Sequence, residues 1–508
     1  MAAGRFAVPG TARGGLLTAA CGVLLAGATV LAFFAGGYFP EAQAWAGVAA
    51  WALVAVALVL SPGSLPRRPG AWLALGGLFL FAGWTLLSII WAPIAGSAYH
   101  AGQLVFLYVG ALLAAILLLR DPRAQRAVEP ALATGALIVI GYGLAGRLLP
   151  GLLHFAQSSS AEGRLEQPLT YWNAMGVLAA LGLVLSTRLA GDVQRPAPIR
   201  VAALAGSVPL ALGLYLSFSR GALFACVAGL LALIIAAPRR EQLVSIALAV
   251  GAGAVASAVA SPFGGLTKLV GSLASRERQG AIELAVLVVV TLAAALLHWR
   301  LVLRRRSGEL RLPRHTTWIA TAVICAGLAL AIAVGSKEAT SSPSNTGASR
   351  LAAFQSNRYA YWRVALKAFA HEPIRGVGAG GWAAWWLRYR TTDDFAQDAH
   401  SLPLQTLAEL GLVGLALLAV FLAGLALGAR AANRAVPGLA AGPIAGLVVY
   451  VTHAPLDWDW QMPALTLVAM VLAGALLALA ETEQIERPEE QVSTSQVVDT
   501  RPRSVVSA

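Results

Sequence analysis

Runs of about twenty apolar residues, separated by short polar stretches, recur along most of this 508-residue sequence. A run of that length forms a helix of roughly 30 Å, which matches the hydrocarbon thickness of a bilayer. The chain is 58% hydrophobic and 12% charged, with a mean hydropathy of +0.71, so it lacks the polar surface of a soluble globular protein. The sequence therefore predicts an all-α fold, a polytopic integral membrane helical bundle.

Between twelve and fourteen transmembrane helices are expected, and fourteen spans can be placed on the sequence. They are 15–36, 44–61, 71–91, 101–119, 131–149, 171–188, 201–217, 221–237, 242–259, 280–298, 316–334, 403–428, 437–454 and 462–480. These spans divide the chain into N-terminal transmembrane helices (1–334), a long extracytoplasmic loop (335–402), C-terminal transmembrane helices (403–480) and a disordered tail (481–508).

The distribution of Lys and Arg predicts which side of the membrane each loop faces, because basic loops are retained in the cytoplasm. With the N-terminus inside, the even-numbered gaps carry basic clusters such as Arg67-Arg68, whereas the outer gaps 37–43, 92–100 and 455–461 carry none. Both termini are therefore expected in the cytoplasm. Much of the formal charge of +13 follows from this orientation, and no basic soluble domain suggests a nucleic acid partner.

The longest polar interruption runs from Arg350 to about Gly414 and is rich in Arg and Trp. Its apolar residues recur at helical spacing in two blocks, which predicts a helix, a glycine bend and a second helix. The bend, 376–381, matches G-x-G-x-x-G, but no strand precedes it, so we do not interpret it as a dinucleotide site. The stripe of Trp382, Trp385, Trp386 and Tyr389 favours an interfacial aromatic belt over a platform for sugar rings.

Three polar residues precede spans that run from outside to inside: Arg164, Arg220 and His400. The N-termini of such spans present unpaired backbone N–H groups and a partial positive charge to the outer surface. Together with the arginines they predict an anion site, suited to a diphosphate at headgroup level. In the alternative interpretation, Ser219 caps the next helix and Arg220 reaches to the interface without binding a ligand.

Arg358 and Trp362 are four residues apart and share one helix face, where a cation–π contact or a headgroup contact would hold the arginine without any role in catalysis. His400 is the best candidate for proton transfer, the alternative being a hydrogen-bonding residue at a helix entry. Glu409 lies about two turns into its span, where an ionisable group is a functional candidate or the partner of an arginine. Cys21, Cys226 and Cys325 have neither disulfide nor metal spacing.

Four segments, in this order, resemble the O-antigen ligase family, whose superfamily includes O-antigen polymerases and protein O-oligosaccharyltransferases. They are Arg164 to Asn173 (RLEQPLTYWN), Ser219-Arg220-Gly221, Arg358 to Trp362 followed by Gly376-Val377-Gly378, and Asp398-Ala399-His400-Ser401 leading into Ala408-Glu409-Leu410-Gly411. The resemblance covers roughly residues 160 to 415.

This resemblance implies a membrane glycosyltransferase that passes a glycan from undecaprenyl diphosphate to an acceptor hydroxyl at the outer face of the cytoplasmic membrane. It implies no metal and no cofactor, and its partners would be the lipid-linked glycan donor, a glycan, lipid or protein acceptor, and membrane lipids. Carried onto this chain, the roles would be diphosphate binding by Arg220, Arg358 and Arg164, catalysis by His400, and support by Glu409, Trp362 and Ser219.

Two other functions stay open at this point. A polymerase of the same superfamily would use the same donor chemistry with a different acceptor. A transporter of a small, bicarbonate-like anion is the rival class, and coupled transport favours acidic groups near the membrane midplane and broken helices. Glu283 and Glu409 are the acids placed within spans, both near the outer ends, which argues against ion coupling.

Overall fold

The structure, a computed structural model, describes residues 10–61, 65–303, 358–391, 393 and 395–481. Within these ranges the regular elements are helices, as predicted, and twelve of them are long and apolar enough to cross a membrane. They are α1 (Gly10–Ala32), α2 (Pro40–Leu60), α3 (Pro69–Leu87), α4 (Ala95–Leu118), α5 (Pro122–Leu148), α6 (Trp172–Gly191), α7 (Ala197–Leu216), α9 (Arg240–Ala260), α11 (Leu273–His298), α16 (Leu402–Ala435), α17 (Pro437–His453) and α18 (Pro463–Glu481).

Four shorter helices complete the part of the chain that concerns the site: α8 (Arg220–Ala236), α10 (Gly264–Thr267), α14 (Arg358–His371) and α15 (Gly381–Tyr389). The apolar α8 has 17 residues. Together with the long helices it accounts for every predicted span except 316–334, which lies outside the described residues, as does the predicted tail after Glu481.

Helix α5 begins earlier than predicted, at Pro122 instead of 131, because Asp121 caps it by accepting a hydrogen bond from the Arg123 N–H at 2.7 Å. The helix consequently includes Glu129, so the prediction that only Glu283 and Glu409 are acids within spans is wrong. Glu129 is buried and lies 3.2 Å from the Arg195 guanidinium. Its charge is thus compensated by an arginine of the turn between α6 and α7.

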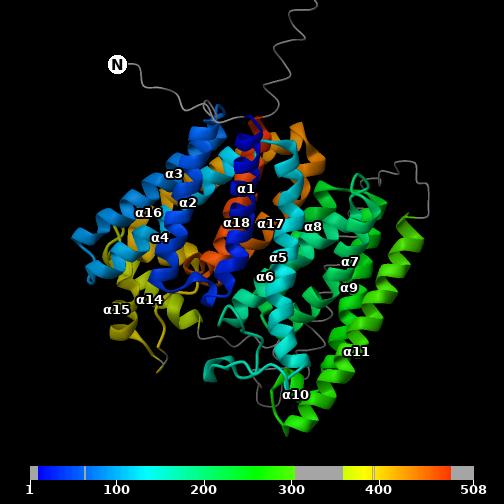
Figure 1. The fold of residues 1–508 in the computed structure, drawn as a ribbon. Coiled ribbons are helices and arrows are strands. Elements are labelled where there is room, and N and C mark those ends of the chain that lie inside the picture. Colours follow the sequence, from blue (N-terminus) through cyan, green and yellow to red (C-terminus); the bar gives the residue numbers. More distant parts are fainter. Residues whose placement is uncertain (1–9, 62–64, 304–357, 392, 394, 482–508) are drawn as a thin grey trace, which may run out of the picture.

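Loops predicted to lie on one side of the membrane gather at one end of the bundle. Figure 1 shows the start of α1 and the finish of α18 at the opposite end from α10, α14 and α15. At the former end, the Arg68 N–H donates to the Glu481 carboxylate at 2.9 Å. At the latter, which we call the loop end, the Tyr38 hydroxyl donates to the Gln397 amide oxygen at 3.2 Å. Which side of a membrane the loop end faces stays a prediction.

The centre of the bundle is formed by α6 and α18, whose apolar segments are fully buried. Around them, pairs of helices approach closely where small residues meet. A Cβ atom added to Gly77 of α3 would lie 2.6 Å from the Phe421 backbone nitrogen of α16. Such small-residue contacts are the usual means of packing helices in a membrane, where burial of apolar area gives little driving force.

Helix α16 is broken at Gly411, whose φ of 64° and ψ of −162° are accessible essentially to glycine alone. The break removes backbone hydrogen-bond partners on both sides, and the segment 373–378 replaces them. Its Gly378 N–H donates to the Glu409 carbonyl at 2.8 Å, and the Leu412 N–H donates to its Pro373 carbonyl at 2.9 Å. The predicted glycine bend is confirmed, and its function in the fold is to hold this break.

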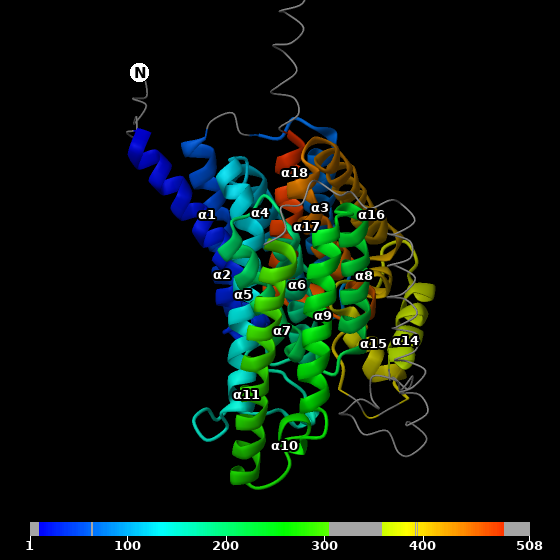
Figure 2. The ribbon, with the colours of Figure 1, turned by 90° about the vertical axis from the view of Figure 1, so that its right-hand side faces the viewer.

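The prediction of an interfacial aromatic belt is wrong for Trp382 and Trp386. Both side chains are 0% exposed and their rings stack with centroids 5.7 Å apart. The Tyr361 ring of α14 meets the Trp386 ring of α15 edge-on at 4.8 Å. These aromatic residues therefore form the small core that joins α14 to α15, which lie together beside α16 in both views (Figures 1 and 2).

Candidate functional site

At the loop end, the buried carboxylate of Asp457 joins three segments that are distant in sequence. Asp457 lies in the turn between α17 and α18 and is 0% exposed. The Arg358 guanidinium, at the start of α14, donates to Asp457 Oδ2 at 2.7 Å. The Tyr171 hydroxyl, just before α6, donates to Asp457 Oδ1 at 2.8 Å. A charged, hydrogen-bonded cluster thus ties the loop helices to the bundle.

The electrostatics of this cluster favour an ion pair over a neutral pair. Burial is the largest influence and opposes ionisation of Asp457, but the Arg358 charge, together with the neighbouring histidines and the Tyr171 hydrogen bond, outweighs it and holds the pKa of the Asp457 carboxyl below its usual range. Burial likewise opposes the charge on Arg358, but Asp457, together with Tyr171 and Asp459, raises the pKa of that guanidinium above its usual value. Arg358 is therefore a permanent cation, and its side chain is still 24% exposed.

The aromatic ring of Trp458 holds the neighbours of this ion pair in place. Its centroid lies 4.5 Å from the Tyr171 ring, 5.4 Å from the Tyr38 ring and 6.4 Å from the His400 ring. The other side of the imidazole faces Tyr361 of α14, with centroids 5.0 Å apart. His400 is thus packed between the turn after α17 and the aromatic core of the loop helices.

His400 has a left-handed backbone conformation, with a φ of 51°, immediately before α16. This conformation brings its Nδ1 atom to 2.9 Å from the carbonyl oxygen of Asp398. Because a carbonyl oxygen can only accept a hydrogen bond, Nδ1 carries the proton in the neutral imidazole. The lone pair is then on Nε2. Trp362 supports this arrangement by donating a long hydrogen bond, 3.5 Å, to the His400 carbonyl.

An imidazole–carboxylate pair lies next to the cluster around Asp457. His453 Nδ1 is 2.6 Å from Asp459 Oδ2, and both side chains are buried. The N-terminus of α8 lies against this pair, since a Cβ atom on Gly221 would be 3.0 Å from His453 Nε2. Arg220 is the first residue of α8 and is half-buried there.

The prediction that Ser219 caps α8 is confirmed. Its hydroxyl oxygen accepts a hydrogen bond from the Ala222 N–H at 3.3 Å. The cap fixes the first turn of α8 at the loop end, where Gly221 lies against His453. Arg220 and this helix terminus together add positive charge there.

Arg164 is 5% exposed and is engaged within its own loop. Its guanidinium donates to the Ala161 carbonyl at 2.8 Å and to the Ser160 carbonyl at 2.6 Å. It also lies 3.7 Å above the ring of Trp172, the first residue of α6. These contacts hold the loop between α5 and α6 against the start of α6. The predicted diphosphate contact of Arg164 stays a prediction.

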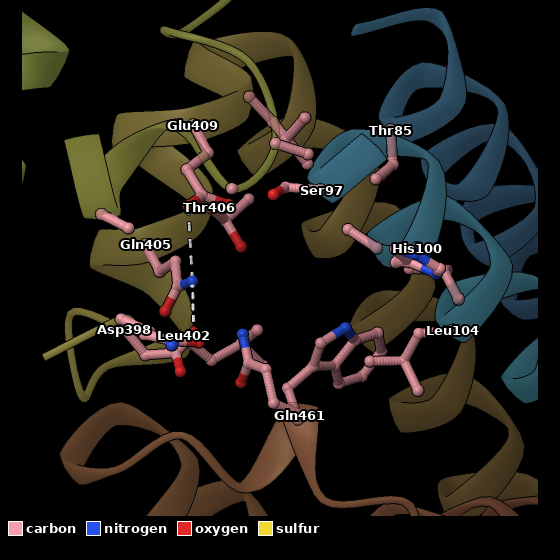
Figure 3. Close-up of a pocket in the computed structure, with 18 of the residues that line it drawn as sticks. Thr85, Ser97, His100, Leu104, Asp398, Leu402, Gln405, Thr406, Glu409 and Gln461 are labelled. Atoms are coloured by element: carbon pink, nitrogen blue, oxygen red, sulfur yellow. Dashed lines mark hydrogen bonds between the residues drawn. The ribbon is translucent and has the colours of Figure 1, made fainter. Parts of the chain in front are cut away.

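A polar cavity of about 360 Å³ opens beside the His400 region (Figure 3). Figure 3 shows Glu409, Thr406 and Gln405 of α16 along one wall, facing Ser97 and His100 of α4. Glu409 Oε1 accepts a hydrogen bond from the Trp382 N–H at 3.3 Å. The cavity is also lined by Tyr38, Gln43, Asp398, Trp460 and Gln461.

Comparison with known protein families gives a match for part of the chain. Residues 264–419 match the family described as O-Antigen ligase. This stretch belongs to the O-antigen ligase family. No curated protein matches the chain. This match and the twelve long apolar helices together indicate a multi-pass membrane protein.

The O-antigen ligase stretch contains Arg358, Trp362, His400 and Glu409, which the structure brings to one region of the loop end. Outside the stretch lie Arg164, Ser219 and Arg220, contributed by other helices. In the described part of the chain, no three His, Cys, Asp or Glu side chains are grouped as metal ligands.

Asp457 and Asp459 also lie outside the O-antigen ligase stretch and are not among the residues that the sequence singles out. They belong to Asp457-Trp458-Asp459-Trp460-Gln461, part of a gap that the sequence distinguishes only by its lack of basic residues. Two carboxylates in a short turn between apolar spans are energetically costly unless they are paired. This feature of the sequence could have marked both aspartates as candidate site residues.

Proposed function

We propose that the protein transfers a glycan from undecaprenyl diphosphate to an acceptor hydroxyl, and that the loop end faces the outside of the cytoplasmic membrane. The observation that carries the proposal is the tautomer of His400. With Nδ1–H donated to the Asp398 carbonyl, the Nε2 lone pair can accept a proton. A positioned base near the Arg358–Asp457 ion pair suits the transfer of a glycan to a hydroxyl group.

The donor diphosphate would bind on the basic side of the site. Arg358 is a permanent cation with an exposed fraction of 24%, which lets a ligand reach it. Arg220 adds a second cation at the N-terminus of α8, where helix N–H groups favour an anion. Neutralising the diphosphate makes it a better leaving group, so binding and electrostatic stabilisation act on the same atoms.

The proposed step breaks one bond and forms one. The acceptor oxygen attacks the anomeric carbon of the donor glycan, and a new C–O bond forms. The bond between that carbon and the diphosphate oxygen breaks, and its electron pair leaves with undecaprenyl diphosphate. The acceptor proton passes to Nε2 of His400, which a positioned imidazole accelerates by roughly 10²–10⁴-fold.

One observation bears on the transport alternative. The break of α16 at Gly411, next to Glu409, is a feature that transporters also use at their ion sites. The cavity beside that break is lined by Asp398 and Glu409 and by no Lys or Arg among the described residues. Such a lining offers no cationic partner to a small anion such as bicarbonate, so we favour glycan transfer.

The experiment uses purified full-length protein in liposomes, supplied with an undecaprenyl-diphosphate-linked oligosaccharide and candidate glycan, lipid or protein acceptors. Glycosylated acceptor and free undecaprenyl diphosphate should appear in equal amounts, with or without a chelator. A glycosylated acceptor of repeating units would identify a polymerase. Uptake of labelled bicarbonate without any glycan transfer would contradict the proposal and support the transport function.

A further inference from the structure

The cavity in Figure 3 differs from the Arg358 cluster in its chemistry. Its lining carries two carboxyl groups, the hydroxyls of Thr85, Ser97, Thr406 and Tyr38, and several amides, and His100 is its only basic residue among those described. Trp460 and Tyr38 add aromatic surface. Carboxylates, amides and aromatic rings together can hydrogen-bond hydroxyl groups and cover the apolar face of a ring.

Thr406 supplies a hydroxyl to which none of the described residues is hydrogen-bonded. The residue is 4% exposed and lines the cavity, and Figure 3 shows its side chain among those that face the cavity. Hydroxyls in helices commonly donate to a carbonyl of the preceding turn, as Thr85 does to Phe81 at 2.8 Å. Within the described part of the chain, the Thr406 hydroxyl makes no hydrogen bond. A buried hydroxyl is stable there if a ligand or water completes it.

Gln405 fixes the two carboxylates of the same wall. Its amide nitrogen donates to Asp398 Oδ1 at 2.9 Å and, more weakly, to Glu409 Oε1 at 3.5 Å. Its amide oxygen accepts from the Ala399 N–H at 3.2 Å. With every polar atom of Gln405 engaged, the carboxylates are held in place before a ligand arrives. A preorganised polar wall is what a specific small-molecule site requires.

We propose that this cavity is the acceptor subsite and that it binds a single uncharged or amino sugar through Thr406, Glu409 and Asp398. The term acceptor subsite rests on the proposed function, whereas the binding of a sugar in the cavity does not. The volume of about 360 Å³ lies at the lower end of the range for small-molecule sites, roughly 300–1,000 Å³, and limits the ligand to one or two rings.

The arrangement separates the two substrates by charge. A cavity with two carboxyl groups and no Lys or Arg among the described residues offers no cationic partner to the diphosphate, which is left to Arg358 and Arg220, or to acceptors with carboxylate or phosphate groups. Asp398 connects the cavity to the proposed base, because its side chain lines the cavity while its carbonyl accepts the His400 hydrogen bond. A sugar bound by the Asp398 side chain would therefore lie beside the segment that carries the proposed base.

Binding can be tested without knowing the natural acceptor. The full-length protein in detergent or nanodiscs would be mixed with methyl α-glucoside, methyl α-glucosaminide or methyl α-glucuronide, and binding measured by saturation-transfer NMR. The two variants are Thr406→Val, which removes the unused hydroxyl, and Ala101→Phe, which fills the cavity from α4. Thr18→Val is the control, because the Thr18 hydroxyl donates to the Gly14 carbonyl of its own helix.

We expect wild type and Thr18→Val to bind the glucoside and glucosaminide and to discriminate against the glucuronide. Thr406→Val should weaken binding by about tenfold, the value of one hydrogen bond, and Ala101→Phe should abolish it. Undecaprenyl diphosphate, assayed separately, should bind all four proteins equally, which also shows that the variants are folded.

Unchanged glycoside binding in Ala101→Phe, or no preference against the glucuronide, would overturn the subsite. Failure of the proposed function is a separate result: wild type would then bind glycosides at the cavity but would not bind undecaprenyl diphosphate. If Thr406→Val folds but no longer binds undecaprenyl diphosphate, the donor binds in the cavity. That result would contradict the separation of donor and acceptor sites.

Discussion

The Arg358 guanidinium lies 2.7 Å from the carboxylate of Asp457, a partner 99 residues away that is completely buried. This ion pair connects the helices of the long loop to the turn between α17 and α18. Burial alone would disfavour the charged form of both groups, and each is kept charged by its partner together with neighbouring polar groups. The pair therefore determines both the stability of the loop end and the cation available to a substrate.

The first prediction concerns that pair. Arg358→Met should lower the free energy of unfolding by roughly 3–5 kcal/mol, because it leaves a buried carboxylate without its partner. Adding Asp457→Leu should recover most of the loss, since an apolar pair of similar volume avoids the buried charge. Glycan transfer should stay lost in both. Unfolding in denaturant and the liposome assay measure the two effects.

A matched control is the pair of Arg375 and Glu372 in the same loop, whose nitrogen and oxygen lie 3.3 Å apart. Both side chains are largely solvated, with 52% and 35% exposure, so Arg375→Met should cost less than about 1 kcal/mol. Equal losses from the exposed and the buried arginine would contradict the account of the Arg358 pair.

The second prediction concerns pH. Burial raises the pKa of the Asp398 carboxyl above its usual value. The folded protein then binds this proton more tightly than the unfolded chain, so the stability gained is present at low pH and lost as pH rises through the folded pKa. Asp398→Asn should flatten the fall of the melting temperature above about pH 4, near the ordinary value for aspartate.

Asp393→Asn, a change at an exposed position of the same loop, is the control for this measurement and should keep the wild-type pH dependence. If the melting temperature of Asp398→Asn falls with pH as steeply as that of wild type, Asp398 is not the group responsible.

The third prediction concerns the broken helix. Gly411→Ala should destabilise the protein by several kcal/mol, because alanine rarely adopts its backbone conformation and the new Cβ would overlap the Ile374 carbonyl. Gly141→Ala in α5 is the control: a Cβ there meets nothing within 4 Å, and the change should be neutral or stabilise by about 0.5–1 kcal/mol. Thermal unfolding of both variants in one detergent would compare them. Similar melting temperatures would mean that the break is not needed.

Much of the fold could be predicted from the sequence, because spans, caps and turns are local. The apolar runs predict the helices, and Ser219 is correctly placed as the cap of α8. The break at Gly411 could not be predicted, since glycine is common in continuous membrane helices and the segment that replaces its hydrogen bonds is more than thirty residues away. The same holds for Asp457, whose partners come from two other segments.

The aromatic stripe shows where local pattern misleads. Helical spacing of Trp382 and Trp386 indicates one apolar face, but it does not say whether that face meets lipid or protein. In the structure α14 covers it, through Tyr361. For Arg164, an arginine before a helix suggests an anion site, and this stays a prediction; the structure adds that its guanidinium donates to two carbonyls of its own loop. Only the tertiary structure reveals these partners.

The most direct test of the central claim is glycan transfer by wild type, His400→Ala and Arg220→Ala in liposomes, with binding of undecaprenyl diphosphate measured on the same preparations. We predict that both variants are folded and lose transfer, by roughly 10²–10⁴-fold for His400→Ala. We also predict that carrier binding is kept in His400→Ala and weakened in Arg220→Ala. Full transfer activity in both variants would contradict the assignment of base and diphosphate site.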